Sequence, residues 1–354
     1  MGRIGGAAIF VMAGMVTTAA AQAPRKLILF HADGAGTAHW SVARQAVGEL
    51  AVDRFQALGL SDTRGADHIV TESAAGATAL ATGVRSFMGA LGVGPDSQPR
   101  ETVLEAAQAR QMATGLVTTT YIVDATPAAF YSHSPSRRDW GTIIGHLVQR
   151  RPNVLIGGGR ELFEQMMTSD SVGLLDALRH IYTVVVSGPD LAALDPNTVT
   201  NLMALLAAHD LPLAGAREPS LARLTEIALT MLDKNPNGFF LLVENEETDT
   251  QAHDNADYAV IAAEMRAFDE AICVAVSYQE RHPETLIVVA ADHETGGMIL
   301  ATDSLGGPQV AYVTLGHTGE MVPVFANGPG AERFRGLLRN EEVGQAMLEW
   351  IRGR

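Results

Sequence analysis

One serine has surroundings that would suit a nucleophile. Ser73 is followed by Ala-Ala-Gly-Ala and lies in the stretch Thr71–Gly83, where almost every residue is small. Small residues allow a helix to begin tightly at this point, so that the hydroxyl would lie at a helix N-terminus, where free N–H groups favour an anion. This setting would suit a nucleophile that attacks phosphate. A simple helix cap in a close-packed run explains the same residues, so the stretch alone does not decide.

Carboxylates and imidazoles recur later in the chain with spacings that suit a metal ion. Asp249 and His253 are four positions apart and therefore share one face of a helix, although a solvated surface pair would look the same. Asp292 and His293 are adjacent, and the turn residues that follow them can bring both side chains inward. His317 lies in a turn flanked by glycines. Such Asp/His sets are typical of zinc sites with an open coordination position.

Oxygen ligands are also present, and they would suit magnesium. Glu244, the Thr126 hydroxyl and a shared carboxylate from Asp33 form a hard-oxygen set. Asp33, Asp124, Glu244 and Asp292 each follow an apolar run. Four carboxylates gathered at one edge of a sheet would repel one another, and bound cations are the usual remedy.

The elements that would position these residues are strands and helices in alternation. The apolar runs are Lys26–Asp33, Gly115–Asp124, Phe239–Val243 and Thr285–Asp292, with a further strand at Asn153–Ile156. They show no clear polar alternation, as expected for parallel strands covered on both faces. Helical patterns lie between them, for instance Glu101–Arg110 and Asp254–Glu280. We therefore predict a doubly wound α/β fold with a mostly parallel sheet and helices on both faces.

The chain divides into a leader and one domain. Residues 1–23 have the charged start, short apolar core and Ala-Gln-Ala end of a secretory signal peptide, although a buried helix or a membrane anchor would look similar. Residues 24–354 form the α/β domain, and the less regular stretch at about 166–224 is where a small cap or insertion would fit. No later run is long enough to span a bilayer, so we expect a periplasmic or secreted protein. The single cysteine, Cys273, lies in an apolar run and is predicted to be buried.

The overall charge excludes one class of partner. The 354 residues carry a formal charge of −15, which argues against a nucleic-acid-binding surface because no basic stripe is present. An acidic protein that handles an anionic substrate needs local positive charge, from metal ions or a placed arginine.

These motifs, in this order, resemble those of the alkaline phosphatases. The resemblance runs from Lys26 to Phe334. It rests on the segments Asp33–Gly36, Thr71–Val84, Gly89–Val93, Asp124–Ala128, Ser136–Arg137, Glu244–His253, Ala291–Gly297 and Gly316–Thr318. Each segment is a weak signal by itself, whereas all of them together in the order of the family are strong evidence.

The resemblance implies two zinc ions and one magnesium ion held by side chains from these segments. One zinc ion would bind Asp249, His253 and His317, the other Asp33, Asp292 and His293, and magnesium would bind Asp33, Thr126 and Glu244, with Asp124 next to its water shell.

The resemblance also implies an exported phosphatase that hydrolyses phosphate monoesters. Ser73 would take the phosphoryl group, and Arg137 would hold two phosphate oxygens with its planar fork. A surface salt bridge is the alternative role for Arg137, because charged residues follow it directly. A homodimer, common in the family, stays open, because the intervals that carry crown-like insertions in the family look short here.

Three positions depart from the family pattern. Glu72 stands where many relatives have Asp beside the serine, and this residue helps to orient the arginine. Thr250 stands where relatives often carry Lys, His or Trp near the phosphate, so we expect weaker binding of the product phosphate. Met88 replaces a common Asn, and nothing in the sequence explains this change.

Two other functions are alternatives to a monoesterase. A phosphodiesterase or sulfatase of the same superfamily is the nearer alternative. The Ser73 stretch lacks the sulfatase Ser/Cys-x-Pro-x-Arg pattern, and Thr126, Glu244 and Ser73 together favour the monoesterase over a diesterase. A non-catalytic protein that binds metal or phosphate is the more distant alternative.

Overall fold

A computed structural model describes residues 1–2, 25–167 and 173–353 of the chain. The predicted signal peptide, residues 1–23, lies outside the described residues apart from its first two.

The architecture is a ten-stranded sheet in the order β14-β2-β13-β8-β1-β7-β3-β4-β6-β5. Its strands are β1 (Arg25–Ala32), β2 (Ala57–Asp62), β3 (Ala113–Tyr121), β4 (Val154–Gly158), β5 (Thr183–Val185), β6 (Leu202–Leu205), β7 (Gly238–Asn245), β8 (Thr285–Ala290), β13 (Val322–Asn327) and β14 (Gly336–Arg339). All neighbours pair in parallel except β13, which is antiparallel to β2 and β8. The predicted mostly parallel α/β sheet is confirmed.

The central strands are buried on both sides, which explains why their sequences show no polar alternation. On β1, Leu27 and Leu29 join one hydrophobic cluster, whereas Ile28 and Phe30 join another. Because successive side chains of a strand point to opposite faces, each cluster fills one face of the sheet. Helices must therefore cover both faces.

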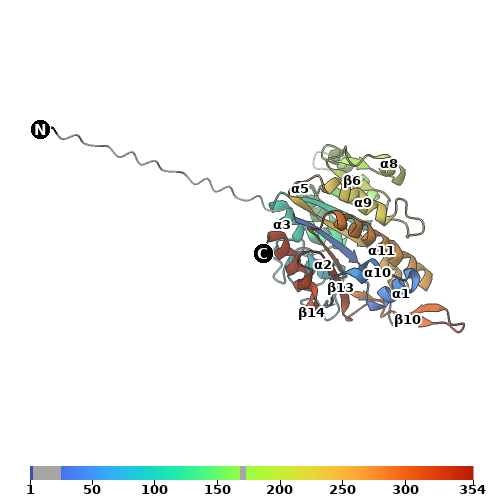
Figure 1. The fold of residues 1–354 in the computed structure, drawn as a ribbon. Coiled ribbons are helices and arrows are strands. Elements are labelled where there is room, and N and C mark those ends of the chain that lie inside the picture. The colour runs from blue at the N-terminus through green and yellow to red at the C-terminus, as the bar shows by residue number, and fades with distance from the viewer. Residues whose placement is uncertain (3–24, 168–172, 354) are drawn as a thin grey trace.

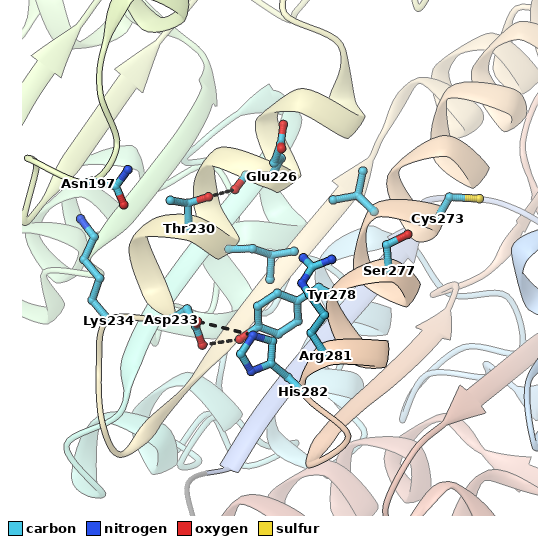
Figure 2. A pocket seen from close by; sticks show the side chains of 12 residues that line it. Asn197, Glu226, Thr230, Asp233, Lys234, Cys273, Ser277, Tyr278, Arg281 and His282 are labelled. Carbon is cyan, nitrogen blue, oxygen red and sulfur yellow. Dashed lines mark hydrogen bonds and ion pairs between the residues drawn. The ribbon is translucent and has the colours of Figure 1, made fainter.

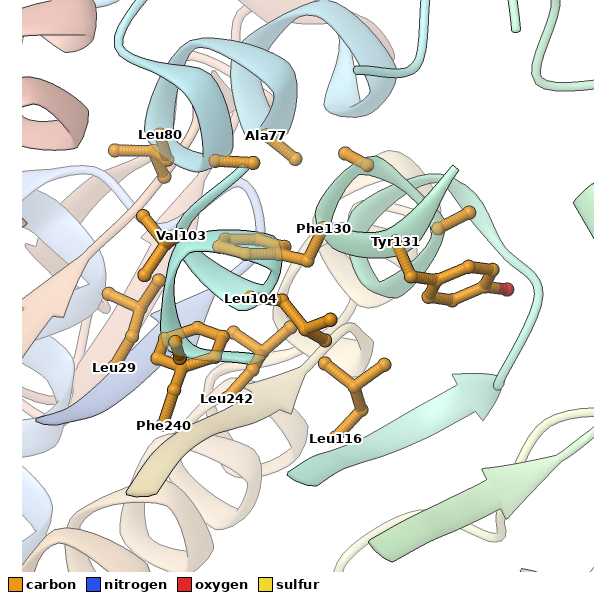
Figure 3. Packing of buried hydrophobic residues seen from close by; sticks show 14 of the residues in the cluster. Leu29, Ala77, Leu80, Val103, Leu104, Leu116, Phe130, Tyr131, Phe240 and Leu242 are labelled. Carbon is orange, nitrogen blue, oxygen red and sulfur yellow. The ribbon is translucent and has the colours of Figure 1, made fainter. Parts of the chain in front are cut away.

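One face is covered by α2, α3 and α12, and the other by α1, α9 and α11 (Figure 1). The helices are α1 (Thr37–Val47), α2 (Ser73–Thr82), α3 (Val103–Ala109), α4 (Ala125–Tyr131), α5 (Trp140–Arg150), α6 (Arg160–Gln165), α7 (Leu174–Leu178), α8 (Gly188–Ala193), α9 (Leu221–Leu232), α10 (Glu247–His253), α11 (Tyr258–Arg281) and α12 (Asn340–Arg352). Figure 3 shows the first of these faces, where Ala77 and Leu80 of α2 lie near Leu29 of β1 and the Phe130 ring of α4. This packing fixes the start of α2 relative to the sheet.

Short elements lie outside the main layers. The pairs are β9 (Glu294–Thr295) with β12 (His317–Thr318), and β10 (Ile299–Thr302) with β11 (Pro308–Ala311), and two 3₁₀ turns span Ala51–Arg54 and Ala331–Phe334. The β10–β11 hairpin projects from the body of the molecule (Figure 1).

The stretch at about 166–224 contributes strands to the same sheet. β6 pairs with β4, and β5 pairs with β6 as the outermost strand of that edge. This part of the stretch, where a cap or insertion was expected, extends the sheet. The division of the chain into domains stays a prediction.

Two further expectations can be compared with the described residues. None of their helices has the length and apolar content to cross a membrane. The prediction that Cys273 is buried is wrong, because α11 turns this residue toward solvent while Ile272 beside it packs in the core. An apolar run in a long helix still contains positions that face outward.

Candidate active site

The predicted carboxylates gather at one edge of the sheet, where the central parallel strands end. Asp33 follows β1, Asp292 follows β8, and Asp124 caps α4 just after β3. Glu244 differs slightly from expectation, because β7 continues to Asn245 and carries this carboxylate as its penultimate residue. The carboxyl edge of a parallel sheet is where α/β proteins place their ligands.

The first metal set is Asp33, Asp292 and His293, and all three side chains are nearly or fully buried. His293 Nε2 lies 3.3 Å from Asp292 Oδ2 and 3.6 Å from Asp33 Oδ1. None of these three atoms has a hydrogen-bond partner. Two unpaired carboxylate oxygens within 3.6 Å of an unpaired imidazole nitrogen suit a divalent cation, because leaving such buried atoms unpaired costs free energy.

The second metal set is Asp249, His253 and His317. His253 Nε2 lies 3.3 Å from Asp249 Oδ2, and His317 Nε2 lies 3.7 Å from Asp249 Oδ1. His253 Nδ1 donates to the carbonyl of Leu315 at 2.5 Å, and His317 Nδ1 donates to the carbonyl of Thr71 at 2.9 Å. These bonds leave a lone pair on each Nε2, and the two Nε2 atoms are 3.0 Å apart. Two lone pairs this close suit a shared cation.

The two sets adjoin each other. The rings of His293 and His317 stack with centroids 3.6 Å apart, and His293 Nδ1 lies 4.0 Å from Asp249 Oδ1. The Gly34 backbone adopts a φ of +67° beside Asp249, and a Cβ at Gly34 would lie 2.5 Å from Asp249 Oδ1. A side chain there would displace the carboxylate, so a glycine is needed at this turn.

The third set is Thr126, Asp33 and Glu244, which contribute oxygen atoms only. The Thr126 hydroxyl donates to Asp33 Oδ2 at 3.3 Å, and Glu244 Oε1 is buried without a partner. Burial raises the pKa of Glu244 to about 7. Burial and then the charges of Asp292, Asp249 and Glu244 raise the pKa of Asp33 well above its ordinary value. Such a concentration of buried acids calls for bound cations, and this set suits a hard ion such as magnesium.

Ser73 begins α2, and residues on either side of it in the sequence contact the two Asp/His sets. The carbonyl of Thr71, two residues earlier, accepts the His317 hydrogen bond. Gly76, three residues later, packs against Asp292 so closely that a Cβ at Gly76 would lie 2.7 Å from Asp292 Cβ. The Ser73 side chain is buried, and its neighbours in sequence contact His317 and Asp292, one residue from each set.

Arg137 is held by two carboxylates beside Ser73. Its Nη1 donates to Glu72 Oε2 at 2.8 Å, and its Nη2 donates to Asp124 Oδ1 at 3.1 Å. Burial acts against the charge, but Asp124 and Glu72 raise the pKa of Arg137 above its ordinary value. A guanidinium fixed in this way is permanently charged and presents a planar fork. The arginine is therefore held in a partly buried network with two carboxylates, and not in a simple surface salt bridge.

Glu72 keeps the role expected for the shorter Asp of relatives. Its carboxylate accepts hydrogen bonds from the backbone N–H groups of Ala74, Ala75 and Gly89 at 3.1, 2.9 and 2.8 Å, in addition to the bond from Arg137. This one side chain therefore both caps α2 and holds the arginine.

The Thr250 side chain is hydrogen-bonded to a carboxylate. Its hydroxyl donates to Glu246 Oε1 at 2.5 Å across one turn of α10. Burial, and then the nearby charges of Asp124, Glu247 and Asp249, raise the pKa of Glu246 well above its ordinary value. The position where relatives often carry a cation therefore faces a carboxylate in this chain.

The comparisons with known proteins agree with this geometry. The family model described as alkaline phosphatase matches residues 24–314. The chain belongs to the alkaline phosphatase family. It is thus a phosphoric monoester hydrolase of a metal-dependent family.

Among curated relatives of this alkaline phosphatase, the streptomycin-6-phosphate phosphatase of Streptomyces griseus is 33% identical over 97% of this chain and 95% of its own length. The repressible alkaline phosphatase of Saccharomyces cerevisiae is 36% identical over 79% of this chain, which spans 56% of the yeast protein. The alkaline phosphatase of the Antarctic bacterium TAB5 is a solved structure with a TM-score of 0.86 and 29% identity over 94% of this chain and 100% of that chain. A TAB5 variant contains magnesium in its M3 site.

Several residues that contact the cluster were not singled out from the sequence. His31 on β1 lies 3.5 Å from Asp292, and the Thr118 hydroxyl donates to Glu244 at 2.5 Å. The Thr295 hydroxyl donates to Asp249. For His31 a signal was available, because it precedes Asp33 by two positions and so shares its face of the strand.

A groove of about 760 Å³ lies at the opposite edge of the sheet, between α9 and α11 (Figure 2). None of the predicted site residues lines it. Its charged lining is largely committed to structural contacts. Asp233 accepts the Tyr278 hydroxyl and pairs with the buried Lys26 at 2.7 Å, and Lys234 donates to two backbone carbonyls. The candidate active site of this alkaline phosphatase is therefore the cluster at the carboxyl edge.

Proposed function

We propose that this chain is an exported alkaline phosphatase that hydrolyses phosphate monoesters through a phosphoserine on Ser73, with two zinc ions and one magnesium ion. One observation carries the proposal. The unpaired buried oxygens of Asp33 and Asp292 lie within 3.6 Å of His293 Nε2, and Asp292 packs against Gly76 in α2, the helix that begins at Ser73.

The donor sets indicate which residues hold each ion. The mixed nitrogen and oxygen sets are those of Asp249, His253 and His317 and of Asp33, Asp292 and His293, and both suit zinc. The oxygen set of Asp33, Thr126 and Glu244, with Asp124 nearby, suits magnesium. When bound, the ions supply Lewis-acid stabilisation of the charge that develops on the reacting oxygens.

The chain's own residues then perform the following roles. Arg137 binds two non-bridging phosphate oxygens with its fork, and Glu72 and Asp124 hold the guanidinium in place. The Ser73 oxygen forms a bond to phosphorus while the bond to the ester oxygen breaks, and the alcohol leaves with a proton. Water then displaces the Ser73 oxygen, which regains its proton as inorganic phosphate is released.

The substrate class and the location rest on two other observations. The relative from Streptomyces griseus, which matches almost the full length of both chains, is named for a small phosphorylated molecule, so we propose a small phosphomonoester as substrate. The N-terminal pattern supports export to the periplasm or medium. A homodimer is compatible with the family, and size-exclusion chromatography with light scattering will decide it.

A direct test compares p-nitrophenyl phosphate with bis(p-nitrophenyl) phosphate. We expect a clear preference for the monoester, loss of that activity in Ser73→Ala, and loss of activity after chelation that zinc plus magnesium restores. A preference for the bis ester would assign a diesterase. Unchanged hydrolysis in Ser73→Ala would remove the covalent mechanism.

A further inference from the structure

His31 is a buried histidine that the proposed mechanism does not use. It is the penultimate described position of β1, and its side chain has no solvent exposure. Neither ring nitrogen has a hydrogen-bond partner. A histidine in the core normally donates at least one hydrogen bond, because an unpaired buried N–H costs free energy. The position of His31 therefore calls for an explanation.

The strand directs His31 toward the cluster. Leu27 and Leu29 point to the face covered by α2, and His31 continues this alternation toward Asp33. Its neighbour across the β1–β7 register is Glu244, and its neighbour across the β1–β8 register is Ala290. The residues that point to this face from the earlier part of β1 and from β7 are leucine and phenylalanine. His31 therefore interrupts an apolar pattern at the point where the cluster begins.

The contacts of Asp292 place His31 on one side of a carboxylate shared with His293. His31 Nε2 lies 3.5 Å from Asp292 Oδ1, and His293 Nε2 lies 3.3 Å from Asp292 Oδ2. His31, Asp33 and Asp292 each contribute one ligand atom, and these three atoms all lie within 4.8 Å of one another. Two imidazoles therefore flank one buried carboxylate from opposite oxygens, and the atoms of His31, Asp33 and Asp292 form a set of metal-ligating spacing.

We propose that His31 binds a divalent transition-metal ion together with Asp33 and Asp292, as an additional nitrogen ligand on the buried side of the cluster. A nitrogen ligand favours zinc or cobalt over magnesium, which prefers oxygen. The set of His31, Asp33 and Asp292 should therefore bind a transition metal in preference to magnesium, although two of its three residues supply oxygen ligands. This proposal extends the metal cluster of the proposed function, but its test does not require hydrolysis.

The test uses His31→Leu, because leucine continues the apolar alternation of the strand. His39→Leu is the matched control, since His39 is also fully buried and its ring nitrogens also lack hydrogen bonds, but it lies on α1 and outside the set. The full chain and both variants are purified, stripped with a chelator and dialysed against a mixture of zinc and magnesium. Bound metal is then counted by mass spectrometry, and the visible spectrum is recorded after loading with cobalt.

We expect His31→Leu to need at least about tenfold more zinc for the same occupancy, to change its cobalt spectrum, and to retain more magnesium relative to zinc. The rise in melting temperature on adding zinc should also shrink, whereas His39→Leu should keep all of these values. If His31 were only a core residue, His31→Leu would keep the zinc affinity, the cobalt spectrum and the metal-dependent rise, and this result would overturn the proposal. If His31→Leu does not fold, His31→Asn is measured in the same way and judged by the same outcomes.

Failure of this proposal differs from failure of the proposed function. Normal metal content in His31→Leu with intact phosphatase activity rejects only the role of His31. Absence of phosphatase activity in the metal-loaded wild type rejects the proposed function, while the metal measurements still decide the role of His31.

Discussion

Replacing Glu72 by Gln tests how the arginine is held. The wild-type carboxylate bonds Arg137 at 2.8 Å and three backbone N–H groups, and its side chain is only 12% exposed. Burial opposes ionisation, but the N–H groups and Arg137 lower the pKa of Glu72, so the carboxylate is ionised at neutral pH. Glutamine keeps the shape, removes the charge and turns an N–H₂ group toward donors.

The expected loss follows from the hydrogen bond to the guanidinium. A hydrogen bond to a charged group is worth about 1.5–3 kcal/mol, so its loss should lower kcat/KM by about 10- to 150-fold if Arg137 is then misoriented. Weakening of the α2 cap adds a stability loss of about 1 kcal/mol. Steady-state kinetics on a phosphate monoester and urea unfolding measure the two effects separately.

Glu105→Gln is the control for this experiment. The Glu105 carboxylate caps α3 by accepting the Thr102 N–H at 2.9 Å, pairs with His133, and is 11% exposed, but it lies away from the cluster. The Glu105→Gln variant should lose about as much free energy of unfolding as Glu72→Gln does, while its kcat/KM changes by less than about twofold. Wild-type kcat/KM in Glu72→Gln, or an equal loss of kcat/KM in Glu105→Gln, would refute the reasoning about the arginine.

Three further predictions concern the phosphate, the metals and pH. Thr250→Lys replaces the hydroxyl that is bonded to Glu246 by a cation. Inorganic phosphate should therefore inhibit the variant about tenfold more strongly than the wild type. An unchanged inhibition constant would contradict an effect of this position on phosphate binding. Chelation should lower the melting temperature more at pH 9 than at pH 6. Burial is the first cause that raises the pKa of the metal-free Asp33 carboxyl, so ionisation of this carboxyl at higher pH destabilises the metal-free fold. Equal drops in melting temperature at both pH values would contradict this effect of Asp33. Burial opposes the charge on His133, but hydrogen bonds to Glu105 and to the Gly92 carbonyl raise the pKa of His133. The stability that the charged His133 contributes is therefore present below about pH 6.5, and it is lost as the pH rises through the raised pKa. The free-energy difference between wild type and His133→Gln should therefore be larger at pH 6 than at pH 9, and a constant difference would exclude this linkage.

The sequence predicted those parts of the fold that rest on local pattern. Buried parallel strands appear as apolar runs, so the ends of β1 and β8 were located to within two residues, and with them Asp33 and Asp292. The i, i+4 spacing of Asp249 and His253 was realised in α10. Local patterns succeed here because strand and helix periods are properties of neighbouring residues.

The missed features depend on contacts between distant segments. The spacing of His31 and Asp33 suggests a shared face, but it does not show that His31 meets Asp292, because that contact needs the pairing of β1 with β8. The apolar run around Cys273 does not show which side of α11 faces solvent. The strands β6 and β5 are short, and they join the sheet only because β6 pairs with β4 and β5 pairs with β6. Tertiary pairing decides these points, and a single sequence carries little information about it.

The account depends most on Ser73 being the group that accepts phosphate. Its central measurement is rapid acid quenching of the metal-loaded protein during turnover of a ³²P-labelled monoester, followed by mapping of the label. We predict label on the peptide that contains Ser73, at a level that falls as substrate is exhausted, and none in Ser73→Ala. Label on another residue, or steady hydrolysis by Ser73→Ala, would contradict the account.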